Sequence, residues 1–195
     1  MTYKQQPTFG QHLHYKLQRA FRQAWEGFPD LHHHKIIVKH RDLKKVSMRA
    51  QPIVDQNIFK KGHRSYQIEV NQKLIFQDDR KLYQLPHAVL VGWFAHELGH
   101  LKDYQSRSGF GLLRLGIAYS LLPAYKIGVE RKADLLALQN GFGPYLERTK
   151  RFLLREGGIN PAYLARLKKY YMSIEEINRL MEERERSLRL PHTVH

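Results

Sequence analysis

The stretch from Pro86 to Leu101 most restricts how this 195-residue chain can fold. It predicts a helix on which apolar residues occupy nearly every face, and such a helix is normally buried. Within it lies the run His96–His100, of sequence His-Glu-Leu-Gly-His. Burying two imidazoles and a carboxylate without partners is costly, so the fold has to supply something that satisfies all three.

The spacing of these polar residues is that of a zinc site. On a helix, His96 and His100 lie one turn apart on the same face, where both can reach one Zn²⁺, and Glu97 lies beside the metal-bound water. We therefore predict a helix over about 86–104, with Zn²⁺ as cofactor and Glu97 as general base. The alternative is a pair of core histidines that hydrogen-bond to nearby carboxylates.

A catalytic zinc ion needs three protein ligands and an open position. The chain has no cysteine, which leaves histidine and carboxylate ligands. The metzincin pattern requires Gly and His where this chain has Asp103 and Ser106. Between Asp103 and Glu147 the only carboxylates are Glu130 and Asp134, one helical turn apart.

We predict that Glu130 is the third ligand and that Asp134 accepts the free N–H of a ligand histidine, which fixes the orientation of that ring. The alternative for Glu130 and Asp134 is a helix-surface pair that binds neighbouring lysines or arginines.

Together these motifs resemble those of gluzincin metallopeptidases, which combine His-Glu-x-x-His with a downstream Glu-x-x-x-Asp on a second helix. The chain is similar, over about residues 66–143, to the minigluzincins and to the soluble core of the CAAX-prenyl-protease and heat-shock membrane-protease group. The resemblance implies a zinc-dependent metalloendopeptidase that acts on peptide or protein substrates. It also implies that Asp134 braces His96 and that a sheet edge near Tyr66–Asn71 aligns an extended substrate.

In these relatives a tyrosine or histidine steadies the oxyanion, and the candidates here are Tyr125, Tyr163, Tyr170, Tyr171 and His87. The membrane relatives carry spanning helices between the two motifs. This chain has only the segment 110–129, which is interrupted by Arg114, Pro123 and Lys126.

The remaining pattern predicts an α+β, zincin-like fold in a single domain over residues 1–195. Its parts are an N-terminal helix and sheet (10–80), active-site helices (86–141) and C-terminal helices (144–190). Apolar alternation near 36–38, 46–50 and 66–70 predicts a small, mainly antiparallel sheet of three strands, packed on the metal-binding helix. We expect loose termini over 1–9 and 188–195, and a surface position for His32–His34.

Charge and composition narrow the class of partner. The net charge is +15, but the basic residues lack the aromatic interleaving of a nucleic-acid-binding surface, so nucleic acid is not expected as a partner. The opening residues lack the apolar core that a secretory signal requires, so we expect no export, and the absence of cysteine fits the cytoplasm. Two alternatives to a peptidase remain: a zinc-binding regulatory protein without turnover, and a peripheral membrane or polyanion-binding module that uses the segment 110–129.

Overall fold

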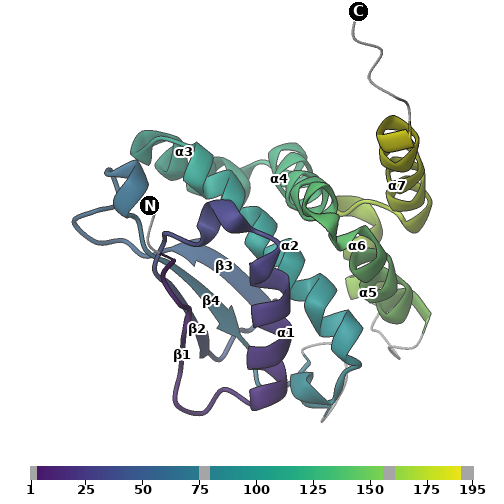
Figure 1. Cartoon of the computed structure of the whole chain (residues 1–195), viewed down its shortest axis with the longest axis horizontal. Coiled ribbons are helices and arrows are strands. Elements are labelled where there is room, and N and C mark those ends of the chain that lie inside the picture. The colour runs from purple at the N-terminus through teal and green to yellow at the C-terminus, as the bar shows by residue number, and fades with distance from the viewer. Residues whose placement is uncertain (1–3, 75–79, 156–160, 190–195) are drawn as a thin grey trace, which may run out of the picture.

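The computed structural model describes residues 4–74, 80–155 and 161–189 (Figure 1). The strands are β1 (Thr8–Phe9), β2 (Ile36–His40), β3 (Met48–Pro52) and β4 (Tyr66–Val70). The helices are α1 (Tyr15–Glu26), α2 (His87–Ser106), α3 (Gly109–Leu121), α4 (Pro123–Ala137), α5 (Gly143–Arg155), α6 (Pro161–Tyr170) and α7 (Ile174–Arg189). A π-helical turn, Leu138–Phe142, joins α4 to α5. The α+β class is thus as predicted.

The sheet differs from the predicted one. It has four strands in the order β1-β2-β4-β3, and only the β3–β4 pair is antiparallel, with Ala50 opposite Ile68. Strand β2 pairs in parallel with both β1 and β4. The prediction of three mainly antiparallel strands is therefore wrong in number and in direction. The reason is that β4 inserts between β2 and β3, so β2 and β3 do not form the hairpin expected of consecutive strands.

This strand order also moves the sheet edge. Because β2 and β3 flank β4, the predicted substrate-aligning edge at Tyr66–Asn71 lies inside the sheet, and that prediction is wrong. The edge strand on this side is β3, and β3 contacts α2. The edge of the sheet on this side is therefore Met48–Pro52.

Helix α2 is the central element of the molecule (Figure 1). It contacts β3, α1, α4 and α5, and from Val89 to Leu101 every residue on it is buried. Close packing against α5 depends on Gly92, since a Cβ there would lie 2.2 Å from the carbonyl oxygen of Tyr145. The predicted buried helix is confirmed, and it shares one core with α1 and the sheet.

Arg64 ties the sheet to the end of α2. Its side chain is fully buried, and it donates hydrogen bonds to the backbone carbonyls of Ile58, Tyr104 and Arg107. The last carbonyls of a helix lack partners within the helix, and a positive charge is favourable at that end. Arg64 supplies both the donors and the charge.

Two predictions about exposed residues are wrong. Thr8 and Phe9, expected in a loose terminus, pair with β2, and α7 continues to Arg189, while residues 1–3 and 190–195 lie outside the described part. His34 is buried, and its Nδ1 lies 3.0 Å from the carbonyl oxygen of Arg64. His34 precedes the buried Ile36 by two residues and so lies on the same inward side of the chain. Burial, assisted by His33, lowers the pKa of His34 to about 4.

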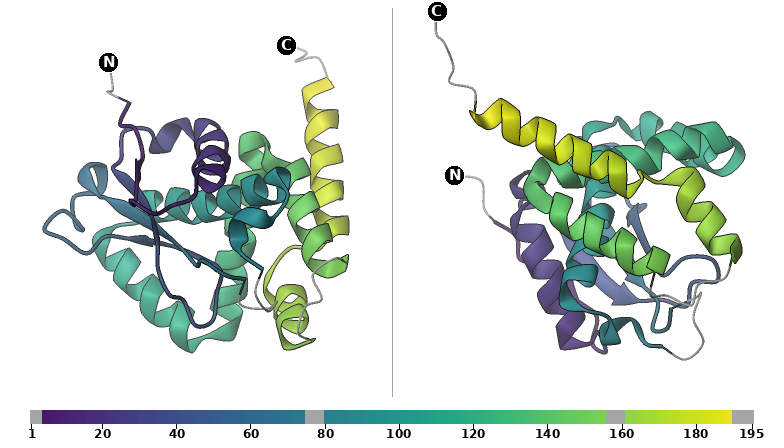
Figure 2. Two further views of the ribbon diagram at one scale, coloured as in Figure 1. Left: turned by 90° about the horizontal axis from the view of Figure 1, so that it is seen from below. Right: turned by 90° about the vertical axis from the view of Figure 1, so that its right-hand side faces the viewer.

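Helix α3 lies on the outside of the molecule (Figures 1 and 2). Its inner residues Leu112 and Leu115 are buried, whereas its outer residues Leu113, Ile117 and Leu121 are exposed. No single helix within the described ranges is long and apolar enough to cross a membrane. Helix α3 and the helical run Pro123–Arg155 meet that criterion only together, across a bend of 118°.

Candidate metal centre

The side chains of His96, His100 and Glu130 converge where α2 packs on α4. The Nε2 atoms of the two histidines are 3.1 Å apart, and Glu130 Oε2 lies 3.2 Å from His96 Nε2 and 3.4 Å from His100 Nε2. All three residues are buried. Zinc binds nitrogen and oxygen ligands at about 2.0–2.2 Å, so two ligand atoms on one tetrahedral ion lie roughly 3.3–3.5 Å apart. The group can therefore hold a metal ion.

The two helices approach closely because of Gly99, inside the motif. A Cβ at Gly99 would lie 2.3 Å from the carbonyl oxygen of Ala133 in α4. Ala133 is itself fully buried, between Glu130 and Asp134 on the same helix. The small residues at 99 and 133 thus let α4 bring its two carboxylates up to the imidazoles of α2.

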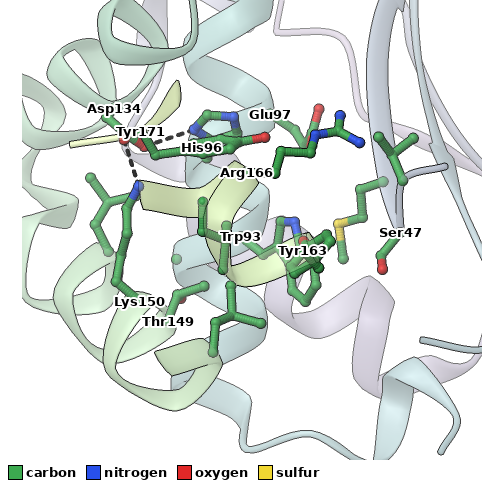
Figure 3. A pocket seen from close by; sticks show the side chains of 16 residues that line it. Ser47, Trp93, His96, Glu97, Asp134, Thr149, Lys150, Tyr163, Arg166 and Tyr171 are labelled. Atoms are coloured by element: carbon green, nitrogen blue, oxygen red, sulfur yellow. Dashed lines mark hydrogen bonds and ion pairs between the residues drawn. The ribbon is translucent and has the colours of Figure 1, made fainter. Parts of the chain in front are cut away.

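Asp134 holds the far side of the His96 ring, as Figure 3 shows. Its Oδ1 lies 2.8 Å from His96 Nδ1, and its Oδ2 accepts hydrogen bonds from Lys150 Nζ at 2.7 Å and from the backbone N–H of Met172 at 3.1 Å. Burial raises the pKa of Asp134, but Lys150 and His96 outweigh it and lower that pKa to about 2. An ionised carboxylate only accepts, so Nδ1 of His96 is the donor and its Nε2 faces Glu130.

The carboxylates of Asp134 and Glu130 favour a positive charge at His96. Burial opposes the imidazolium form of His96, yet its contacts with Asp134 and Glu130 raise the pKa of His96 to about 10. Likewise, the contacts with His100 and His96 outweigh burial and hold the pKa of Glu130 well below its usual value. The site therefore favours a cation, whether a proton on His96 or a metal ion.

Glu97 points from α2 toward the edge strand. Its Oε2 accepts the backbone N–H of Ala50 in β3 at 2.7 Å, and the hydroxyl of Tyr104 donates to the carbonyl oxygen of Ala50 at 3.4 Å. Burial raises the pKa of Glu97, although the neighbouring His96 and His100 oppose the shift. A carboxyl group with a raised pKa is suited to exchanging a proton near neutral pH.

A cleft of about 480 Å³ opens onto this group. Its walls come from β3, α2, α3, α4 and α6, and Glu97, His100 and Glu130 all line it. A smaller cavity of about 60 Å³ adjoins the cleft at His96 and Glu97, and Trp93, Thr149 and Tyr163 line it (Figure 3). The reactive group thus borders both the cleft and this smaller cavity.

Of the five residues that were considered for stabilising an oxyanion, the structure places two beside the site and three away from it. Tyr163 and Tyr171 line the small cavity together with His96 and Glu97, and burial raises the pKa of both phenols. They therefore remain neutral donors. The other three lie elsewhere: His87 contacts Gln23, Tyr125 accepts from Arg107, and the Tyr170 ring lies against Lys126 and Lys169.

Sequence reasoning missed three residues of the site. The hydroxyl of Tyr119 in α3 donates to Glu130 Oε1, Lys150 in α5 binds Asp134, and Tyr104 binds Ala50. Tyr104 could have been found, because it lies four residues after His100 on the same face of the helix. Nothing in the local sequence connects Tyr119 or Lys150 with the ligands, because both approach from other helices.

For the predicted site, the structure therefore tests the arrangement of the residues and not the identity of the metal or the reaction. The structure brings together His96, His100, Glu130 and Asp134 and places Glu97 on the open cleft, while zinc itself and catalysis remain predictions. Comparison with protein-family models, with curated proteins and with solved structures found no match to this chain.

Proposed function

We propose that the protein is a zinc-dependent metalloendopeptidase of the gluzincin type. The observation that carries the proposal is the set of three buried ligand atoms, separated by 3.1–3.4 Å, next to a carboxylate that lines an open cleft. His96, His100 and Glu130 would hold the zinc ion, which would act as a Lewis acid toward a peptide carbonyl and a water molecule.

The protein side chains then divide the remaining work. Glu97 takes the proton of the attacking water and passes it to the leaving amine, and the N–H of Ala50 orients it. Tyr171, which lines both the cleft and the small cavity, can donate to the developing oxyanion. Asp134, fixed by Lys150, keeps the His96 ring in its ligand orientation.

Strand β3 gives the substrate an edge to pair with. Ser47 and Ile53 bond to the chain on the β4 side, and Ala50 directs its N–H to Glu97 on the opposite side. By alternation, Met48 also presents its N–H and C=O away from β4, toward the cleft. An extended peptide that pairs with Met48 would pass beside Glu97.

The decisive test is metal content together with turnover. We expect about one zinc per chain in the wild type, and loss of zinc in His96→Ala and Glu130→Ala. Glu97→Gln should keep the zinc and lose at least about 100-fold in peptide cleavage, since it cannot accept the proton.

Two other results would contradict this proposal. Substantial proteolysis by Glu97→Gln would remove Glu97 from its role, and a folded wild type that takes up no zinc would remove the metal. Stoichiometric zinc without cleavage of any peptide would favour the zinc-binding regulatory alternative.

A second function is favoured by the outer face of α3. The exposed residues Phe110, Leu113, Ile117 and Leu121 form an apolar strip, and the ring of Phe59 lies 5.5 Å from that of Phe110. Residues 104–129 contain no Asp or Glu, and the whole chain carries a net charge of +15. We propose that this strip inserts into the surface of an anionic membrane, because an apolar face in a basic protein binds there through both effects.

Vesicle sedimentation tests this second function. We expect the wild type to sediment with vesicles that contain phosphatidylserine, less so at high salt, and the double variant Ile117→Ser/Leu121→Ser to stay in solution. Leu188→Ser is the matched control, since Leu188 is equally exposed but lies on α7. Failure of the wild type to sediment, or equal loss of sedimentation in the control, would contradict it.

A further inference from the structure

Three positively charged side chains line the cleft beside the candidate metal centre: Lys45, Lys126 of α4 and Arg166 of α6. The carboxylates that line the same cleft are Glu97 and Glu130, which belong to the reactive group itself. A fourth cation, Arg49, is already paired with the buried Glu69. Apart from Glu97 and Glu130, the described lining of the cleft holds no acidic side chain that is free to offset these cations.

Two of these cations are held in place. Arg166 donates from Nη1 to the carbonyl oxygen of Lys45 at 3.0 Å. The ammonium group of Lys126 lies 4.8 Å from the ring centroid of Tyr119 and 4.9 Å from that of Tyr170. Tyr119 in turn donates to Glu130, so Lys126 is fixed next to the metal ligands. Groups fixed in this way lose little freedom when they bind a ligand.

The arrangement differs from that on α7. On α7, Arg179, Arg186 and Arg189 each pair with a glutamate one turn away. In contrast, none of Lys45, Lys126 and Arg166 lies within ion-pair distance of a carboxylate in the described part of the chain. Burial, followed by the charges of Arg166 and Lys45, lowers the pKa of Lys126, while the charge of Glu130 opposes the shift. An anion between these cations would offset their mutual repulsion.

We propose that Lys126 and Arg166 bind a carboxylate of the peptide substrate, so that the enzyme selects peptides with a carboxylate close to the scissile bond. The inference rests on the proposed peptidase function and names its substrate class. Asp and Glu side chains and the C-terminal carboxylate of a peptide offer the same chemistry to these cations. Binding of the C-terminal carboxylate would direct cleavage to the C-terminal end of the peptide.

Three pools of random-sequence decapeptides distinguish these sources, with cleavage followed by mass spectrometry on the zinc-loaded protein. One pool has free C-termini, the second is amidated, and the third replaces Asp and Glu with Asn and Gln. Preference for the first pool over the second identifies the C-terminal carboxylate, and preference for the first over the third identifies an acidic side chain.

In the preferred pool, Arg166→Gln and Lys126→Gln should each reduce kcat/KM by about 10–100-fold, mainly through KM, as expected for the loss of a charge-assisted hydrogen bond. Cleavage of the other pools should hardly change. Lys168→Gln is the matched control, because Lys168 lies on the same helix but is exposed outside the cleft. Zinc content and circular dichroism verify that each variant is folded.

The possible failures are distinguishable. Equal cleavage of all three pools by the wild type overturns the carboxylate inference and leaves the peptidase proposal intact. Cleavage of no pool overturns the peptidase proposal. Calorimetry with glutarate then tests the carboxylate subsite directly, and equal affinity in the wild type and Arg166→Gln overturns it as well.

Discussion

Helices α2 and α3 follow each other in the chain. Apolar residues are usually buried and charged residues exposed, and the two helices depart from this pattern in opposite ways. Helix α2 buries two histidines, His96 and His100, and two acidic side chains, Glu97 and Asp103. Helix α3 exposes Phe110 at 76% and Leu121 at 72%. Buried ionisable groups and exposed apolar groups both cost free energy unless a partner satisfies them.

The two helices differ in the kind of partner that would satisfy these residues. At the α2–α4 junction the side chains already hold one another in position, and what they favour is a positive charge. On α3 the apolar residues are in place, but their outer surface contacts solvent. The first region can therefore hold a small cation, and the second is the surface for which we propose a membrane partner. Each of the following measurements tests one side of this contrast.

The largest effect is expected when a charge is removed from the buried region. Asp134→Asn leaves Lys150 buried without its counter-ion and removes the acceptor of His96, so it should lower the free energy of unfolding by about 3–5 kcal/mol. Urea unfolding of the metal-free protein measures this change. Lys150→Met added to Asp134→Asn should recover part of the loss, and a loss below about 1 kcal/mol for Asp134→Asn alone would show that the site does not depend on this charge.

A pH titration should affect the same region in the metal-free protein. The pKa of His96 is raised from 6.5 to about 10, so its contribution to stability is fully present below pH 6.5 and is lost as the pH rises through 10. The melting temperature of the metal-free protein should therefore fall as the pH rises through this range. In the zinc-loaded protein the metal replaces the proton, and the fall should be absent. An equal fall in both forms would contradict the placement of zinc at His96.

A smaller effect is expected from added volume between the helices. Gly99→Ala places a methyl group against the carbonyl oxygen of Ala133, and it should cost about 1–3 kcal/mol and weaken zinc binding as α4 moves away. Gly128→Ala is the control, because no atom lies within 4 Å of a Cβ at that position. Thermal unfolding and zinc titration of both variants measure the difference, and similar behaviour would mean that the close approach is not needed.

The smallest effect on stability is expected from α3. Ile117→Ser alters an exposed side chain, so the free energy of unfolding should change by less than about 0.5 kcal/mol. A clearly larger loss in chemical denaturation would show that the outer face of α3 contributes to the core, and the contrast with α2 would then disappear.

How much of this could be read from the sequence depended on the range of the interactions. Helix α2 was placed within a few residues, because its apolar residues and the spacing of His96 and His100 are local. Glu130 and Asp134 were singled out for the same reason, by one helical turn between them. The strand order failed because the insertion of β4 between β2 and β3 depends on contacts distant in sequence. The ammonium of Lys150 and the hydroxyl of Tyr119 were missed because each lies on a different helix from the carboxylate that it binds.

His34 shows a different kind of failure. The alternation of side chains was applied to the three histidines as a group, whereas it assigns each residue separately. His34 shares the inward side with Ile36, and only His32 and His33 keep partly exposed positions. The physical rule was sound, but it needed the position of the first buried residue of β2 as its reference.

The hydrogen bond from Ala50 to Glu97 has a consequence for anyone who wishes to redesign this protein. One residue of the edge strand both belongs to the surface that would guide a peptide and holds the carboxylate that would take up the proton. A shift of β3 that admits a bulkier peptide would therefore also change the orientation of Glu97. Changes of selectivity are better introduced on α6, whose cleft-lining side chains do not touch Glu97 by a hydrogen bond in the described structure.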